Sequence, residues 1–234
     1  MSRPGEVESR GGAAPRANPV LRRLFSLTGV VPLNAFLVLH LFDMWRATQS
    51  RSAFESSLLR APWPLALELV VLWLPLAFHA AYGVRLLLRG DSLELATTNP
   101  RDPRRILLRG AAWLTLAFLV WHLVAFRLRL ALGTLAPNAV YDELCASLSS
   151  TIAWGIPLVA IGYVLGLAAT LFHTTRGLLR MSRDWQPLAR RKRVVAIALP
   201  LLGAVAFIWG LNSIVVLATG SNLLFAPASP HLGY

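Results

Sequence analysis

Long, uninterrupted runs of apolar residues dominate the pattern of this chain of 234 residues. Each run is close to or longer than the roughly 20 residues that a helix needs to cross the hydrocarbon core of a bilayer. Lipid satisfies no backbone polar group, and the runs are too long for barrel strands, so they predict helices. The expected spans are residues 24–45, 65–88, 106–126, 151–179 and 194–219. The sequence therefore predicts an all-α integral membrane bundle of five transmembrane helices.

Composition and charge add an orientation to this bundle. The chain is 56% hydrophobic, above the roughly 45–50% of soluble domains, and its net charge is +12. Eighteen of the 23 Lys and Arg residues fall on one side of the expected spans, which indicates membrane topology rather than nucleic-acid binding. The N-terminus is accordingly expected in the cytoplasm and the C-terminus outside.

The two ends of the chain differ from the transmembrane domain, which is expected at residues 21–220. Residues 1–20 contain no apolar run and are interpreted as a flexible cytoplasmic tail rather than a cleavable signal peptide. Residues 221–234 are expected to form a short exterior tail. The single cysteine, Cys145, excludes an internal disulfide and a cysteine-ligated cluster within this chain.

Histidines are the candidate chemistry of the expected spans. His40, His79, His122 and His173 fall one in each of the first four spans, the fifth span has none, and His231 lies in the exterior tail. Ionisable residues inside a bilayer are rare and face the bundle interior or water. A lone histidine of this kind is more often a packing residue, but four on consecutive helices favour ligation.

Depth sorts the four histidines into two pairs. His40 and His122 lie about 16 residues from the cytoplasmic ends of their spans, so roughly 24 Å deep, and His79 and His173 lie roughly 9 Å deep. An outer and an inner bis-histidine site are therefore expected, about 15 Å apart. Two axial imidazoles suit haem iron, whereas zinc would want three or four ligands at one level. The sequence thus predicts two b haems.

Glycines near the histidines are expected to make room for haem. Gly83 and Gly177 each follow a histidine by four residues and share its face, where a missing side chain leaves space for a porphyrin edge. Gly29 and Gly162 each precede a histidine of their own span by eleven residues and are expected at the level of the other haem. The alternative is that these glycines only permit close helix packing.

Arginines near the histidines are candidate partners for haem propionates, because guanidinium binds carboxylate bidentately. Arg176 and Arg180 share the face of His173, and Arg129 follows His122 by seven residues. The alternative is that all three are ordinary interface arginines, and that alternative is stronger for Arg129.

Five helices with one histidine in each of the first four resemble the di-haem cytochrome b anchor of succinate:quinone oxidoreductases, the five-helix type of succinate dehydrogenase and fumarate reductase. The resemblance covers nearly the whole chain after the tail. It is carried by five strings, Ser26-Leu-Thr-Gly29, Phe36-Leu-Val-Leu-His40, Phe78-His79-Ala-Ala-Tyr-Gly83, Trp121-His122 and Phe172-His173-Thr-Thr-Arg-Gly177.

The resemblance implies roles and partners. His79 and His173 would ligate the proximal haem, and His40 and His122 the distal one, which agrees with the depth argument. A flavoprotein and an iron–sulfur subunit would dock on the cytoplasmic face, with the basic loop 176–193 as part of the dock. Electrons would pass to or from a membrane quinone, menaquinone or another, in the cytoplasmic membrane of a bacterium. The chain alone would catalyse no bond chemistry, and the direction of flux stays open.

Acidic residues near the outer pair are candidate proton carriers for that quinone. Glu68 precedes His79 by eleven residues, and Asp43 follows His40 by three. A quinol that is oxidised loses protons, which a positioned carboxylate accepts. The alternative for Glu68 is a solvated position at the interface, and Glu55 in the outer loop is a weaker candidate.

Two other classes of protein stay open at this stage. A di-haem cytochrome of the b561 type also pairs alternate helices but works without a soluble flavoprotein partner. A haem-free transporter would use the histidines as proton relays. The cytochromes b of nitrate reductase and hydrogenase place two ligands on one helix, which this sequence does not.

Overall fold

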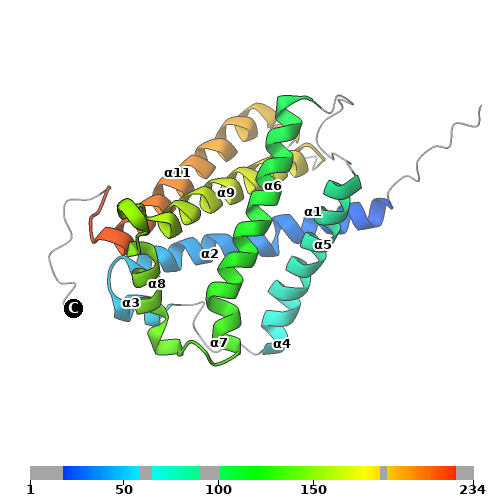
Figure 1. Ribbon diagram of the computed structural model, residues 1–234. Coiled ribbons are helices and arrows are strands. Elements are labelled where there is room, and N and C mark those ends of the chain that lie inside the picture. The colour runs from blue at the N-terminus through cyan, green and yellow to red at the C-terminus, as the bar shows by residue number, and fades with distance from the viewer. Residues whose placement is uncertain (1–17, 58–64, 90–100, 185–188, 225–234) are drawn as a thin grey trace, which may run out of the picture.

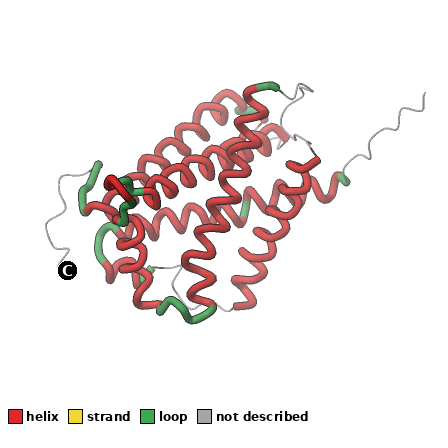
Figure 2. Tube along the Cα trace, viewed as in Figure 1, coloured by secondary structure: helices red, strands yellow, loops and turns green. Residues whose placement is uncertain are grey.

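The computed structural model describes residues 18–57, 65–89, 101–184 and 189–224, and within this part of the chain the secondary structure is entirely helical (Figures 1 and 2). Five helical stretches are long and apolar enough to cross a membrane, as predicted. Most of the tail 1–20 and of the exterior tail 221–234 lies outside the described residues. The spans are residues 19–47, 66–89, 103–131, 158–183 and 192–219.

Three of the five spans consist of several consecutive helical elements. The first joins α1 (Pro19–Val30) and α2 (Pro32–Ala47). The second joins α4 (Leu65–Glu68), the π-helical turn η2 (Leu69–Trp73) and α5 (Leu74–Arg89). The third joins α6 (Pro103–His122), the π-helical turn η3 (Leu123–Leu128) and α7 (Arg129–Ala131). The fourth and fifth are the single helices α9 (Leu158–Asp184) and α11 (Lys192–Thr219).

Two spans begin with the same local sequence signal. Asn18 caps α1 by accepting a hydrogen bond from the backbone N–H of Val20, and Asp102 caps α6 by accepting one from Arg104, each at 2.9 Å. A proline follows each cap at the first helical position, where its missing N–H costs nothing.

Prolines also explain the break in the first span. Pro32 has no N–H to donate, so the helix is interrupted at Val31 between α1 and α2. The side-chain amide of Asn34 donates to the carbonyls of Gly29 and Val30, at 2.9 and 3.0 Å. Carbonyls at the kink thus keep partners within a span that is long and apolar enough to cross a membrane.

Helix α9 is the centre of the bundle. It packs against α11, α6 and α1, while α1 also packs against α5 and α11 packs against α2 (Figure 1). Glycines allow the α9–α11 approach: a Cβ at Gly210 would come within 2.7 Å of Leu167, and one at Gly203 within 2.7 Å of Thr175. The histidine-free fifth helix therefore packs closely along the helix that carries His173.

A small cap closes one end of the bundle. It consists of α3 (Arg51–Glu55) and α8 (Val140–Ser149), which lie together at one end of Figure 1. Helix α8 turns Val140, Leu144 and Leu148 inward, at i, i+4 and i+8, into a core that also contains Phe54 of α3. We call this end the capped end.

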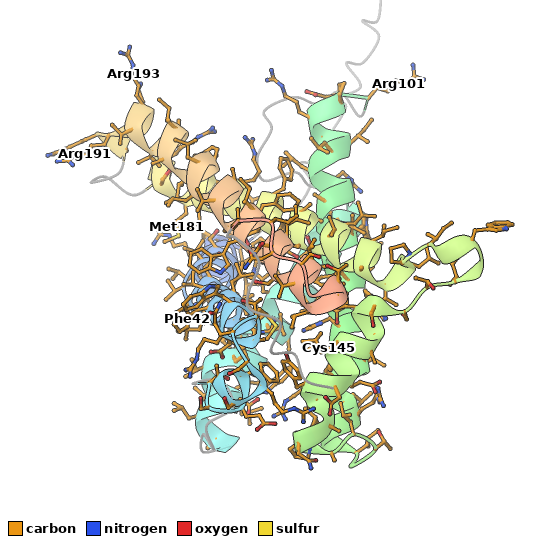
Figure 3. All side chains as sticks on the ribbon, turned by 90° about the vertical axis from the view of Figure 1, so that its left-hand side faces the viewer. Phe42, Arg101, Cys145, Met181, Arg191 and Arg193 are labelled. Atoms are coloured by element: carbon orange, nitrogen blue, oxygen red, sulfur yellow. The ribbon has the colours of Figure 1, made fainter. Side chains whose placement is uncertain are left out.

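Arginines gather at the opposite end, which we call the basic end. Figure 3 shows Arg101, Arg191 and Arg193 at this end, away from Cys145 of the cap. The chain enters α1 at the basic end and leaves α11 beside the cap, where α11 also packs against α8. Which end faces the cytoplasm stays a prediction from the charge distribution.

The fourth span begins later than the sequence suggested. Residues 151–157 were expected in the helix, but α9 begins only at Leu158, after the short 3-10 turn η5 (Ala153–Gly155). Trp154 and Gly155 have left-handed backbone conformations there, with φ of 65° and 71°, which end any regular helix. Pro157 then directly precedes the first residue of α9.

Candidate functional site

Two histidines face each other near the capped end. The ring centroids of His40 on α2 and His122 on α6 are 5.8 Å apart, and the ring planes meet at 65°. Phe36 stacks on His40 at 5.6 Å, and Phe118 stacks on His122 at 5.7 Å. The Nδ1 atom of His122 is 3.1 Å from the hydroxyl of Tyr163, which belongs to the core under the cap.

The other two histidines face each other toward the basic end. The ring centroids of His79 on α5 and His173 on α9 are 6.2 Å apart, with the planes at 80°. Phe25 of α1 stacks on His79 at 4.3 Å, nearly parallel. The backbone carbonyl of Phe25 lies 3.0 Å from Nδ1 of His79 and accepts its hydrogen bond when that nitrogen carries the proton. This arrangement leaves the Nε2 atom of His79 available to a ligand.

The separation within each pair fits two imidazoles on opposite sides of one metal ion. A metal–nitrogen bond of about 2 Å, with the ring centroid about 1 Å beyond the nitrogen, places two such centroids roughly 6 Å apart. The observed 5.8 and 6.2 Å match this value. In the described ranges, no three His, Cys, Asp or Glu side chains lie together in a group that could hold a metal ion. Each pair thus offers two histidine nitrogens, which is the number of protein ligands that a bis-histidine haem requires.

The two pairs lie at different levels of the bundle. Gly29 is in contact with the ring of His79, and His40 lies eleven residues further along the same span. At 1.5 Å per residue, the levels differ by roughly 16 Å. The structure thus brings the four histidines together in the two pairs that the sequence led us to expect, and the spacing between the pairs stays a prediction.

Among curated proteins, the chain is similar to the succinate dehydrogenase cytochrome b558 subunit of Bacillus subtilis (strain 168). The two are 30% identical over 167 residues, which cover 70% of this chain and 78% of the relative. The chain belongs to the succinate dehydrogenase cytochrome b subunit family. No protein-family model matches it, and no solved structure matches it. The family expected from the sequence is thereby confirmed, and the cytochrome b561 and transporter alternatives are not favoured.

Within this cytochrome b subunit, the four candidate glycines have different surroundings. Gly29 meets His79, and Gly83 faces the ring of Phe25. Gly162 faces Trp121, which a Cβ would approach to 3.2 Å, so close packing accounts for this glycine. A Cβ at Gly177 would meet no heavy atom within 4 Å. Open space therefore adjoins Gly177, one turn beyond His173, and its use by a porphyrin edge stays a prediction.

The candidate arginines separate into two groups. Arg176 and Arg180 are half-buried on the last turns of α9, just beyond His173. Arg129 instead forms an ion pair of 2.5 Å with Glu143 of α8. The structure thus assigns Arg129 to the attachment of the cap, and its expected role toward a propionate has no support.

The acidic candidates also differ. Asp43 is 3% exposed on α2, one turn beyond His40. Glu68 accepts hydrogen bonds from the guanidinium of Arg127 at 2.8 Å and from the indole of Trp73 at 3.0 Å. Glu55 lies exposed on α3, 3.9 Å from Arg51.

Glu68, Arg127 and Trp73 form a compact cluster that the sequence alone did not reveal. Glu68 immediately precedes η2, and Arg127 lies within η3. A π turn bonds residue i to i+5, so it brings Trp73 over Glu68, five residues earlier. The guanidinium of Arg127 lies 5.8 Å from the centroid of the Trp73 ring. Such π turns occur frequently at functional sites.

Proposed function

We propose that this subunit anchors a succinate dehydrogenase or fumarate reductase in the bacterial cytoplasmic membrane and passes electrons between its soluble subunits and a quinone. Two b haems serve this transfer, one held by His79 and His173, the other by His40 and His122. The observation that carries the proposal is the pairing of four histidine rings at 5.8 and 6.2 Å in a member of the cytochrome b subunit family.

The bound haems supply one-electron redox chemistry, and the protein sets their ligation and surroundings. The carbonyl of Phe25 accepts a hydrogen bond from the Nδ1–H of His79, which would leave Nε2 to bind the iron. Stacked aromatic rings restrict the turning of His40, His79 and His122. Pre-oriented rings lower the conformational entropy that ligation costs.

The guanidinium groups of Arg176 and Arg180 bind the propionates of the inner haem. Both follow His173 on α9 and are half-buried toward the basic end. A partly buried guanidinium pairs strongly with a carboxylate because the interaction is bidentate and little screened by water. Gly177, between them, would leave room for a porphyrin edge.

The quinone binds at the capped end, beside the outer haem, and exchanges protons with Glu68. Glu68 is 27% exposed at its side chain, so it is reachable, and Arg127 and Trp73 fix its position. Phe126, next to Arg127, lies 5.7 Å from the ring of His122, which links this cluster to the outer pair. Asp43, one turn beyond His40, is the second proton carrier on the same side.

The soluble partners dock at the basic end, which faces the cytoplasm. Arg190, Arg191, Lys192 and Arg193 lie there as a run of four cations before and at the start of α11. The flavoprotein and iron–sulfur subunits approach this positive surface, so the inner haem is the first to exchange electrons with them. Complementary charge steers such association.

The test is the haem content of the complex purified from membranes in which this chain is expressed with its two soluble subunits. Reduced-minus-oxidised spectra should show two b haems per chain. His79→Ala and His173→Ala should each remove the inner haem, and His40→Ala and His122→Ala the outer one. His231→Ala is the control and should retain both. A haem-free complex, or loss of both haems in all four variants, contradicts the proposed ligation.

A further inference from the structure

Tyr163 is the side-chain partner of a candidate haem ligand, and the proposed electron transfer gives it no role so far. It lies on α9, whereas His122 lies on α6, and its hydroxyl oxygen is 3.1 Å from Nδ1 of His122. Tyr163 is 9% exposed, so water does not compete for this hydrogen bond. Its position is therefore a property of how α6 and α9 pack.

Aromatic packing fixes the phenol ring. Phe118 and Trp121 meet it edge to face, with centroids at 5.5 and 5.1 Å. Both neighbours approach α9 because Gly162 and Gly166 lack side chains: a Cβ at either position would crowd Trp121 or Phe118. The hydroxyl of Tyr163 is thus held against His122 by two rings and two glycines rather than by a flexible contact.

The two histidine pairs differ in the group that their Nδ1 atoms face. Near the basic end, Nδ1 of His79 faces a backbone carbonyl, that of Phe25. Near the capped end, Nδ1 of His122 faces a phenol. A backbone carbonyl cannot be changed by substitution, whereas a phenol can, so the capped-end site has a tunable partner.

We propose that Tyr163 is a positioning residue that orients His122 and lowers the reduction potential of the outer haem. When Nε2 of His122 binds iron, Nδ1 carries the proton and donates it in a hydrogen bond to the phenol oxygen. This contact raises the basicity of the imidazole, which favours the more positively charged ferric iron. The inference rests on the proposed function, because it requires a haem at the His40–His122 pair.

The experiment is a redox titration of Tyr163→Phe in the complete complex, with each haem followed by its spectrum. The equilibrium constant for reduction of the outer haem should rise about tenfold. For one electron this raises its reduction potential by about 59 mV. The inner haem should keep its potential. The two potentials are assigned with His79→Ala, which should retain only the outer haem.

Tyr82→Phe is the matched control, because Tyr82 is 8% exposed and its ring packs on Phe25 and Phe78 near the inner pair. It should leave the outer potential unchanged. A graded variant guards against a packing artefact: 3-fluorotyrosine at position 163 keeps the shape of the phenol but weakens its oxygen as an acceptor. The outer potential should then rise by less than in Tyr163→Phe, and in the same direction.

The outcomes separate this inference from the proposed function. Two haems with potentials that Tyr163→Phe leaves unchanged, or moves downward, overturn the role of Tyr163 and leave the haem assignment intact. The role of Tyr163 is also overturned if Tyr82→Phe moves the potential of the outer haem as much as Tyr163→Phe does. A wild-type complex without an outer haem instead refutes the proposed function, and this inference with it.

Discussion

The imidazole of His79 lies directly against the backbone of Gly29, with no space for a side chain between them. A Cβ at position 29 would come within 2.7 Å of Nδ1 of that ring and closer still to Cε1. The ring cannot easily retreat, because Phe25 stacks on it and accepts its hydrogen bond. The first span therefore sets the position of a histidine that it does not carry.

Gly29→Ala should remove the inner haem and retain the outer one. The added methyl group forces the His79 ring out of line with His173, and a displaced ligand no longer completes the pair. The haem-to-protein ratio should fall from two to one in the purified complex. Gly110→Ala is the matched control, since a Cβ there meets nothing within 4 Å and it should keep both haems. Two haems in Gly29→Ala would show that the contact is dispensable.

Glu68→Gln should slow quinone reduction by succinate at least about a hundredfold, which is the usual scale of a lost proton carrier. Glutamine keeps the shape and still accepts hydrogen bonds from Arg127 and Trp73, but it does not take up a proton. Haem content should stay at two, so the loss is not structural. Steady-state rates with a soluble quinone, set beside spectra of the same preparation, measure both.

Glu143→Gln is the control for this experiment. Glu143 is also a partly exposed carboxylate in an arginine pair at the capped end, but it attaches α8 to α7. Partly exposed ion pairs contribute little to stability, so this variant should keep the rate. Equal losses in both variants would contradict a specific role of Glu68.

Hydropathy and depth were sufficient to predict the five spans and the two histidine pairs. The thickness of the bilayer sets a similar length for every span, so counting residues along each helix gives both the spans and the depth of each histidine. The contact between Tyr163 and His122 could not be found in this way. It depends on how α6 and α9 are rotated toward each other, and the glycines that set this approach lie on only one of the two helices.

The cap and the Glu68 cluster were not predicted from the sequence, for different reasons. Helix α8 is too short to be predicted as a span. Its apolar residues at 140, 144 and 148 share one face of a helix, and the acidic residues at 142 and 143 lie on another, so its amphipathic pattern could have been found. Glu68 and Arg127 lie 59 residues apart in the chain, and the π turns that bring the cluster together carry no clear sequence pattern. Tertiary packing decides such local irregularities.

Cys145 of the cap should react slowly with thiol reagents. Burial raises the pKa of its thiol above the ordinary value, and this effect outweighs the hydrogen bond with Tyr141 and the charge of Arg51, which both lower it. Only the thiolate reacts, so the rate of alkylation by iodoacetamide should reach half its maximum at a higher pH than in the chain unfolded in detergent. Since Cys145 is the single cysteine, the label reports on it alone.

Tyr141→Phe should move this midpoint further upward, because it removes the hydrogen bond that favours the thiolate. The raised pKa of the Cys145 thiol also makes the stability of the fold depend on pH. The folded state holds the thiol proton more tightly than the unfolded state, so the cap should lose stability as the pH rises above the ordinary thiol pKa. A midpoint at or below that of the unfolded chain would contradict the partial burial of Cys145 on α8.

Trp154 should lie in the headgroup region of the membrane at the capped end. It is 94% exposed, it has a left-handed backbone that bulky residues rarely adopt, and exposed Ile152 and Ile156 flank it just before α9. Tryptophan favours the interface because its ring is apolar and its N–H still reaches water. Lipid contact gives a reason for an apolar ring that the fold itself leaves uncovered.

Fluorescence quenching by spin-labelled lipids tests this position. A label at the headgroup should quench the wild-type chain more than Trp154→Phe, because the variant lacks an indole ring at that depth. Trp113, 41% exposed ten residues into α6, is the control: Trp113→Phe should instead reduce quenching by a label deep in the acyl chain. If Trp154→Phe changes quenching by the deep label alone, or by neither label, the residues before α9 do not sit in the headgroup layer. In that case the left-handed turn at Trp154 serves the approach to Pro157 and the start of the fourth span rather than contact with lipid.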